Sequence, residues 1–214
     1  MLDSGHTDKD PGALGVRGEY EKHYNDLLIQ EVYTTLSRSG RFKVSLTHKP
    51  GEELSLKERV SRANAIPVDL LLSLHHNAVS ESVSKAAVFQ GKSIRESMEP
   101  VSGYSLYVSQ ENPKFTGSLL FATDIGAAME EIERYPFQAK PSLQVPGSQR
   151  LMNMRFGIFQ YDALGILRSA HMPAVLFEVG FIVDRNDELW LSQNRTLVAQ
   201  QLVNAISRFA ERRR

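Results

Sequence analysis

Residues 174–181 are AVLFEVGF and residues 70–75 are LLLSLH, and these two stretches decide the fold. Short, nearly continuous apolar runs are typical of strands that are buried on both faces of a parallel sheet. Around them, helix-like and strand-like segments alternate along the chain, which favours helices packed on both faces of one sheet. The sequence therefore predicts an α/β fold of three layers, in which a mostly parallel, twisted sheet is flanked by helices.

The neighbouring segments predict the other elements. Residues 21–39 carry apolar side chains every four positions and indicate an amphipathic helix. The capping-box sequence SLKE at 55–58 opens a helix toward Asn64. The remaining expected elements are strands at 42–47 and 104–109, helices at 118–132, 186–191 and 195–213, a polar excursion at 79–102 with room for a short helix, and an irregular proline-containing segment at 134–150.

Size and composition limit the classes of protein that this chain can be. Its 214 residues fit one α/β domain, so we expect residues 1–214 to form a single domain with an inserted lid or loop at about 79–102. Lys+Arg and Asp+Glu balance at 25 each, which argues against a nucleic-acid partner. The absence of cysteine excludes disulfides and cysteine-based zinc sites.

Two further expectations concern membranes and export. No apolar run approaches the roughly 20 residues that a membrane span needs. The first residues, MLDS, lack the basic and apolar regions of a signal peptide, so we expect none in this sequence; earlier removal is one explanation.

Four polar residues stand out, and three of them lie at or near the expected strand ends, where open α/β sheets form their sites. His6 follows the first residues, Glu21 begins the first helix, His75 closes one apolar run and Glu178 interrupts the other. Taken singly, a histidine is usually a surface or core residue, and a glutamate in a first helical turn favours the helix dipole. Glu178 is harder to dismiss, because a buried carboxylate needs a partner; an arginine ion pair is the structural alternative.

Taken together, five segments resemble a known family in its own order. The chain carries DSGHTDKDPGA at 3–13, EKHYN at 21–25, LSLKER at 54–59 followed by Ala63-Asn64, SLHHNA at 73–78 and PAVLFEVGFI at 173–182. These segments are similar to the signatures of the zinc-dependent N-acetylmuramoyl-L-alanine amidases of the amidase-3 type: D-x-G-H-G-G-x-D-P-G-A, E-K-x-x-N, L-x-x-R…A-N, S-I-H-A-N-A and P-A-V-L-V-E-x-G-F-I. The resemblance covers nearly the whole chain.

The resemblance implies that His6, Glu21 and His75 hold one Zn²⁺ ion and that Glu178 is the catalytic glutamate. Glu21 is preferred to Glu19 because Asn25 follows it by four residues, as the family pattern requires. Two histidines and a carboxylate leave one coordination position open for water.

Departures from the family pattern fall beside two of these residues. His76 stands where the family has alanine, and since neighbours on a strand point to opposite faces, we expect it to pack or to face solvent rather than to reach the ion. Thr7 and Asp8 replace two glycines of the pattern after the first histidine.

The implied reaction is hydrolysis of the amide bond between N-acetylmuramic acid and L-alanine in peptidoglycan. The resemblance places this work in the periplasm, cell wall or extracellular space, with cell division as one setting. A zinc peptidase acting on the stem peptide and an inactive wall-binding module remain alternative interpretations.

Weaker expectations concern the surroundings of the site. Arg59, Asn64 and Asn77 are expected to support the site or the fold, and Arg168 either to bind a substrate carboxylate or to form a surface pair. In the resembled family, some members have an occluding segment that supplies a glutamate to the ion, and a protein activator would relieve it. Glu81, Glu96 and Glu99 are available for this role in the 79–102 segment, although a surface loop is the simpler interpretation.

Overall fold

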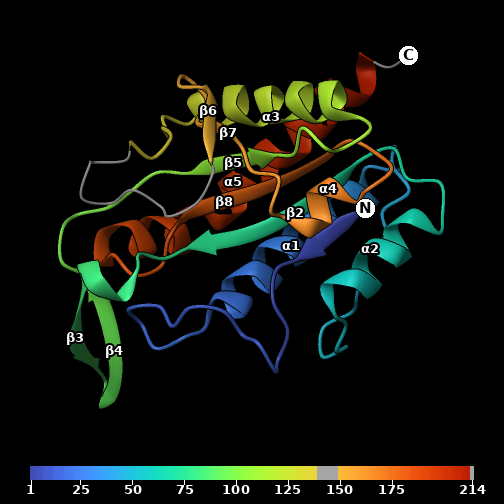
Figure 1. Ribbon diagram of the computed structural model, residues 1–214. Coiled ribbons are helices and arrows are strands. Elements are labelled where there is room, and N and C mark those ends of the chain that lie inside the picture. Colours follow the sequence, from blue (N-terminus) through green and yellow to red (C-terminus); the bar gives the residue numbers. More distant parts are fainter. Residues whose placement is uncertain (139–148, 213–214) are drawn as a thin grey trace.

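The computed structural model of the chain describes residues 1–138 and 149–212 (Figure 1). Strands and helices alternate along most of the chain, as expected. The described elements are β1 (Leu2–Ser4), α1 (Glu21–Arg38), α2 (Leu56–Asn64), β2 (Leu71–Asn77), the 3-10 turn η1 (Glu81–Val83), β3 (Ser84–Phe89), β4 (Lys92–Ser97), β5 (Ser105–Val108), α3 (Phe115–Glu130), β6 (Arg150–Asn153), β7 (Ile158–Gln160), α4 (Gly165–Arg168), β8 (Ala174–Phe181) and α5 (Arg185–Glu211).

The main sheet has six strands in the order β1-β2-β8-β5-β7-β6. The pairs β1–β2, β2–β8 and β5–β7 are parallel, whereas β5–β8 and β6–β7 are antiparallel. The sheet is therefore mixed, with parallel pairs in the majority. The two stretches that predicted the fold, in β2 and β8, are neighbours near its centre.

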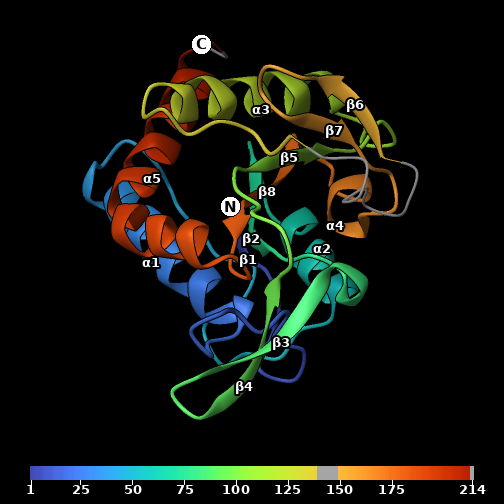
Figure 2. The same cartoon turned by 90° about the vertical axis from the view of Figure 1, so that its left-hand side faces the viewer.

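Helices cover both faces of this sheet, which confirms the three-layer α/β prediction. Figure 2 shows α1 and α5 on one side of the strands and α2 and α4 on the other. Alternate residues of β8 divide between the two cores: Val175 and Phe177 pack with α1, α3 and α5, and Ala174 and Leu176 pack with α2 and α4. A strand buried on both faces needs apolar side chains at successive positions, which explains its sequence.

The 79–102 segment contains a short 3-10 helix, η1, followed by a β-hairpin in place of the expected loop. After η1, β3 and β4 pair antiparallel from Ser84↔Ser97 to Phe89↔Lys92 and project from the body of the fold (Figures 1 and 2). Gln90 and Gly91 join the two strands with positive φ angles of 48° and 79°. Two such residues match the twist of a tight hairpin.

Two other predictions of secondary structure were wrong in detail. Residues 42–47 contribute only an isolated bridge between Leu46 and Leu2, because β1 is too short to pair along the whole segment. The two expected C-terminal helices are one continuous helix, α5, in which Leu191 and Val198 are both buried. Most of the irregular segment at 134–150 lies outside the described residues, apart from 134–138, 149 and 150.

A buried ion pair ties α5 to the end of β8. Arg134 donates to both carboxylate oxygens of Asp187 at 2.6 and 3.0 Å, and to the Val179 carbonyl at 3.2 Å. The same carboxylate accepts the Phe181 N–H at 2.7 Å, and the guanidinium lies 4.2 Å from the ring centroid of Trp190. This network fixes the backbone of β8 at Val179 and Phe181, just after Glu178.

We predict that Arg134→Met strongly destabilises the fold, because it leaves the Asp187 carboxylate buried without its counter-charge. The expected loss is roughly 3–5 kcal/mol, or a fall of about 6–20 °C in the thermal midpoint. The control is Arg155→Met, which removes an exposed pair with Glu130 and should leave the midpoint unchanged. Equal midpoints for the two variants in a thermal melt would contradict the prediction.

Candidate active site

His6, Glu21 and His75 come together at the carboxyl ends of β1 and β2. His6 lies in the loop after β1, Glu21 is the first residue of α1, and His75 lies in β2. The Glu21 carboxylate lies between the two imidazoles: His6 Nε2 is 2.9 Å from Oε2, and His75 Nδ1 is 2.9 Å from Oε1. Among the described residues these three form the one group of side chains whose donor atoms could share a metal ion, with all three atoms within 4.8 Å of one another.

The backbone around His6 fixes the direction of its ring. His6 has a φ of 72°, in the left-handed region that non-glycine residues avoid. Its Nδ1 lies 3.2 Å from the Asp10 carbonyl oxygen, which can only accept, so Nδ1 is the donor in this contact and the ring is turned with Nε2 toward Glu21. The Arg59 guanidinium donates to the carbonyls of Ser4 and His6 at 2.7 and 2.6 Å and holds this strained turn in place.

Two glycines allow the cluster to close. A Cβ atom at Gly5 would overlap the His75 ring, and one at Gly12 would lie 2.7 Å from Glu21 Oε2 and 2.8 Å from the His6 ring. Gly12 also has a φ of 77°. Both positions are glycine in the sequence signature because a side chain at either one would displace a member of the cluster.

The charges of the cluster favour binding a cation. Burial raises the pKa of Glu21, but the hydrogen bonds with His6 and His75 outweigh it and hold the pKa well below its usual value. Burial lowers the pKa of His75, and the hydrogen bond to Glu21 with the charges of Glu178 and Glu21 more than reverses this. The carboxylate is thus ionised and aimed at the space between two imidazole rings.

The donor atoms fit a zinc ion. Zinc bonds of about 2.0–2.2 Å at tetrahedral angles separate neighbouring donor atoms by roughly 3.3 Å. The two His–Glu separations of 2.9 Å are close to this value, so small movements of the side chains would admit an ion. Two nitrogens and one oxygen are also a donor set that zinc prefers.

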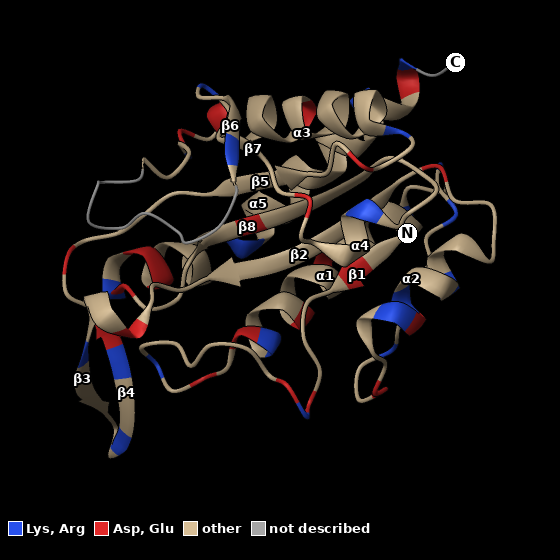
Figure 3. Cartoon of the chain, viewed as in Figure 1, with Lys and Arg blue, Asp and Glu red and all other residues tan. Residues whose placement is uncertain are grey.

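Glu178 lies beside this cluster on the central strand. It is in register with His75 across the β2–β8 pair, and β8 is otherwise uncharged (Figure 3). Its Oε2 is buried and has no hydrogen-bond partner within the described structure. Burial raises the pKa of Glu178 to about 8, lowered in part by His75 and raised further by Glu21. The carboxyl group can therefore exchange a proton near neutral pH.

The other residues singled out in the sequence fall into different places. Arg59 supports the His6 turn, as described above. Asn64 accepts the His171 N–H at 2.9 Å and donates to the Ser169 carbonyl at 2.9 Å, so it fastens the loop before β8. Asn77 accepts the N–H of its neighbour Ala78 at 2.8 Å. Arg168 lies 3.7 Å from the exposed carboxylate of Glu111, in a surface pair.

Sequence reasoning missed two residues next to Glu178. Ser105, on β5, is in register with Glu178, and Tyr107 follows it on the same face of the sheet. Burial, and next the charge of Glu178, raise the pKa of Tyr107, so its hydroxyl stays protonated. The alternation of residues on β5 could have identified this pair only if the neighbouring strand had been known.

Two residues of the cluster line a cavity. A cavity of about 490 Å³ is lined by His6 and His75 together with residues of α2, the loop before it and α4, including Arg59 and Ile166. None of Glu81, Glu96 and Glu99 belongs to the metal-binding group found among the described residues. Glu96 instead pairs with Lys85 and Arg185 at 3.1 and 2.7 Å.

Two histidines and a glutamate at the carboxyl edge of an α/β sheet form a donor set typical of catalytic metal sites. Comparison with known proteins identifies the family of this chain. The chain belongs to the N-acetylmuramoyl-L-alanine amidase family, amidase-3 type, whose sequence profile matches residues 1–208. The sequence resemblance is thereby confirmed.

Individual relatives are distant in sequence. The chain is 26% identical over 204 residues to a putative N-acetylmuramoyl-L-alanine amidase of Buchnera aphidicola, covering 86% of this chain and 81% of that protein. It is 24% identical over 202 residues to the probable amidase AmiB of Haemophilus influenzae, where it covers 87% of this chain but only 46% of the relative. Among solved structures, the catalytic domain of CwlV, an amidase of Bacillus (Paenibacillus) polymyxa var. colistinus, has a TM-score of 0.70 at 25% identity, covering 98% of this chain and 96% of that one.

Proposed function

We propose that this chain is a zinc-dependent amidase that cleaves the bond between the lactyl group of N-acetylmuramic acid and the L-alanine of the stem peptide in peptidoglycan. Membership of the amidase family supports the substrate and the reaction class. The observation that carries the mechanism is the position of Glu178: its unpartnered Oε2 lies on the strand next to His75, in register with it.

We assign His6, Glu21 and His75 as the ligands of the ion. Zinc held there would supply Lewis-acid chemistry, making water more acidic and the scissile carbonyl more electrophilic. The three side chains are turned toward one another by contacts of the chain itself, so little reorganisation is needed when an ion binds.

We assign Glu178 to transfer the proton from the attacking water to the leaving group. Its Oε2 accepts a proton from the attacking water, and the same atom donates it to the nitrogen of the leaving L-alanine as the amide bond breaks. A cation held by His6, Glu21 and His75 would favour the ionised form of Glu178, which the first step needs.

We extend the proposal to the domain arrangement and to the compartment in which the enzyme acts. We propose that residues 1–214 form one catalytic domain, in which the hairpin β3–β4 is an insertion beside the site, and that the enzyme acts in the periplasm or cell wall. None of the described helices is long and apolar enough to cross a bilayer. A protein activator that acts through the 79–102 segment is compatible with the projecting hairpin, which such a partner could reach.

The test is product analysis after digestion of purified peptidoglycan with the zinc-loaded chain. The expected products are peptide-free glycan strands and intact stem peptides with a new N-terminal L-alanine. New N-termini at later stem residues would instead identify a stem-peptide peptidase. Binding to the wall without any hydrolysis by a zinc-loaded, folded chain would identify a wall-binding module and overturn the proposal.

A further inference from the structure

A chain of hydrogen bonds leads from the Glu21 carboxylate away from the metal side. Asn25 lies one helical turn after Glu21 on α1 and is completely buried. Its Nδ2 donates to the Gly5 carbonyl at 3.2 Å and to Glu21 Oε1 at 3.4 Å. Asn25 thus contacts both the glutamate of the cluster and the residue just before His6.

His76 completes this chain on the far side of Asn25. Its Nδ1 lies 2.7 Å from Asn25 Oδ1. Because both hydrogens of the Asn25 amide nitrogen are directed at acceptors, the atom that faces His76 has to be the carbonyl oxygen, and Nδ1 of His76 has to be the donor. Turning the Asn25 amide by 180° would place Oδ1 against the Gly5 carbonyl oxygen and Glu21 Oε1, which are both acceptors.

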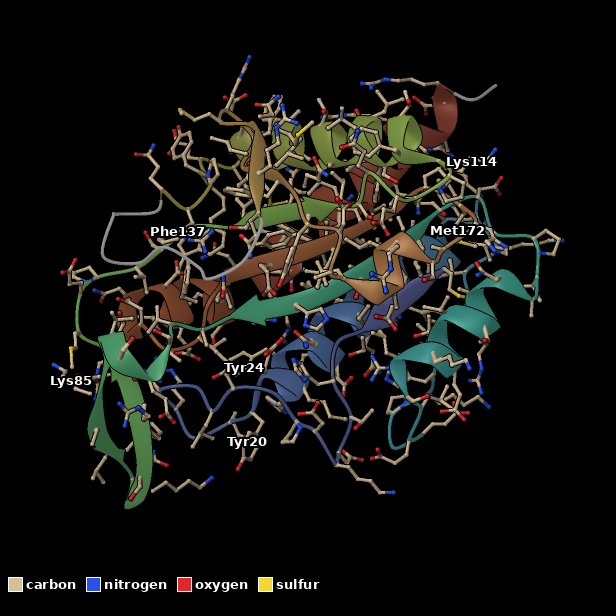
Figure 4. All side chains as sticks on the ribbon, in the orientation of Figure 1. Tyr20, Tyr24, Lys85, Lys114, Phe137 and Met172 are labelled. Atoms are coloured by element: carbon tan, nitrogen blue, oxygen red, sulfur yellow. The ribbon has the colours of Figure 1, made fainter. Side chains whose placement is uncertain are left out.

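The surroundings of His76 bury its imidazole and hold it against α1. His76 is only 5% exposed, and its ring centroid lies 5.6 Å from that of Tyr24, which comes from α1 (Figure 4). The backbone N–H of His76 also donates to Glu21 Oε1, at 3.2 Å.

We propose that His76 is a positioning residue for the metal-binding carboxylate: its Nδ1–H orients the Asn25 amide, which in turn holds Glu21 Oε1 and the Gly5 carbonyl. The inference rests on the proposed role of Glu21 as a ligand. Partners of this kind restrict a ligand to its binding geometry, and their loss typically weakens metal binding about 10- to 100-fold. His76 stands where the resembled motif has alanine, so this device belongs to the present chain.

The test compares His76→Leu with His76→Asn. The two new side chains have nearly the same shape, but only asparagine places an N–H donor at the position of Nδ1. We expect the dissociation constant for Zn²⁺, measured by chelator competition, to rise about 10- to 100-fold in the leucine variant and only a few-fold in the asparagine variant. His23→Ala, which changes an exposed histidine on α1, is the control and should bind as the unchanged chain does.

A second readout separates positioning from simple packing. Replacing zinc by Co²⁺ should give an altered visible absorption spectrum in His76→Leu and a nearly unchanged one in His76→Asn, because only the donor orients the carboxylate. If His76→Leu does not fold, His76→Ala replaces it in both measurements. Equal zinc affinities and equal cobalt spectra for the variants with and without the donor would overturn the inference.

The outcome is distinguishable from failure of the proposed function. A chain that binds zinc with the expected order of affinities, yet hydrolyses no amide, supports the role of His76 and refutes the amidase. A chain with no measurable affinity for zinc refutes both.

Discussion

Glu178→Gln is expected to lower amide hydrolysis by about 10²–10⁴-fold while zinc remains bound in a 1:1 ratio. Glutamine keeps the shape of the side chain but can neither accept the proton of water nor deliver it to the leaving amine. The measurements are release of stem peptides from peptidoglycan and metal content of the purified variant. Glu130→Gln, an exposed carboxylate on α3, is the matched control and should retain full activity.

The same variant should have the opposite effect on stability. Since burial raises the pKa of Glu178 from 4.5 to about 8, the folded metal-free chain favours the protonated carboxyl. Its contribution to stability is complete below about pH 4.5 and is lost as the pH rises through 8. Metal-free Glu178→Gln should therefore melt a few degrees above the unchanged chain at pH 8 and at the same temperature near pH 4. In the zinc-loaded samples, loss of zinc from Glu178→Gln would show that Glu178 is a metal ligand and not only a proton carrier.

Glu21→Gln should abolish zinc binding at concentrations that saturate the unchanged chain, and hydrolysis with it. The substitution removes the negative charge that lies between the two imidazoles and replaces one carboxylate oxygen by an N–H donor, which cannot bind a cation. The loss of affinity should exceed the roughly 10- to 100-fold effect typical of an outer partner such as His76.

Glu19→Gln is the informative control for this prediction. Glu19 is exposed and lies two residues before Glu21, so it tests whether the sequence pattern has selected the right glutamate. Chelator competition should give the same zinc affinity for Glu19→Gln and the unchanged chain. A large loss in Glu19→Gln with no loss in Glu21→Gln would reverse the assignment.

The central strands and the candidate site could be predicted because their residues carry signals that depend little on the rest of the fold. β8 was predicted with the bounds that the structure gives, since a strand buried on both faces has to be apolar at successive positions. The α2 capping box is formed as predicted, with Ser55 and Glu58 bonded reciprocally. Three of the four polar residues were noticed by their place near strand ends, and the ordered family motifs selected the set. The distances between their side chains could not be obtained from a single sequence.

The missed elements depend on contacts between distant segments. β6 and β7 have four and three residues, too few to show a period, and β7 is held by pairing with β5. The polar residues at 192–194 interrupt the apolar pattern of α5, but packing of α5 against α1 and α3 keeps the helix continuous. The hairpin depends less on distant contacts, and Gly91 between two short segments is a local turn signal for it.

The position of β8 has a consequence for the order in which the site is completed during synthesis of the chain. This strand is synthesised after every other strand of the main sheet, yet it lies between β2 and β5, and it brings Glu178 with it. A ribosome-bound chain that ends before residue 174 contains all three candidate ligands but lacks Glu178 and the strand that joins the two halves of the sheet. The carboxylate proposed to transfer the proton is therefore added only with the last strand, so we expect no hydrolysis from an unfinished chain.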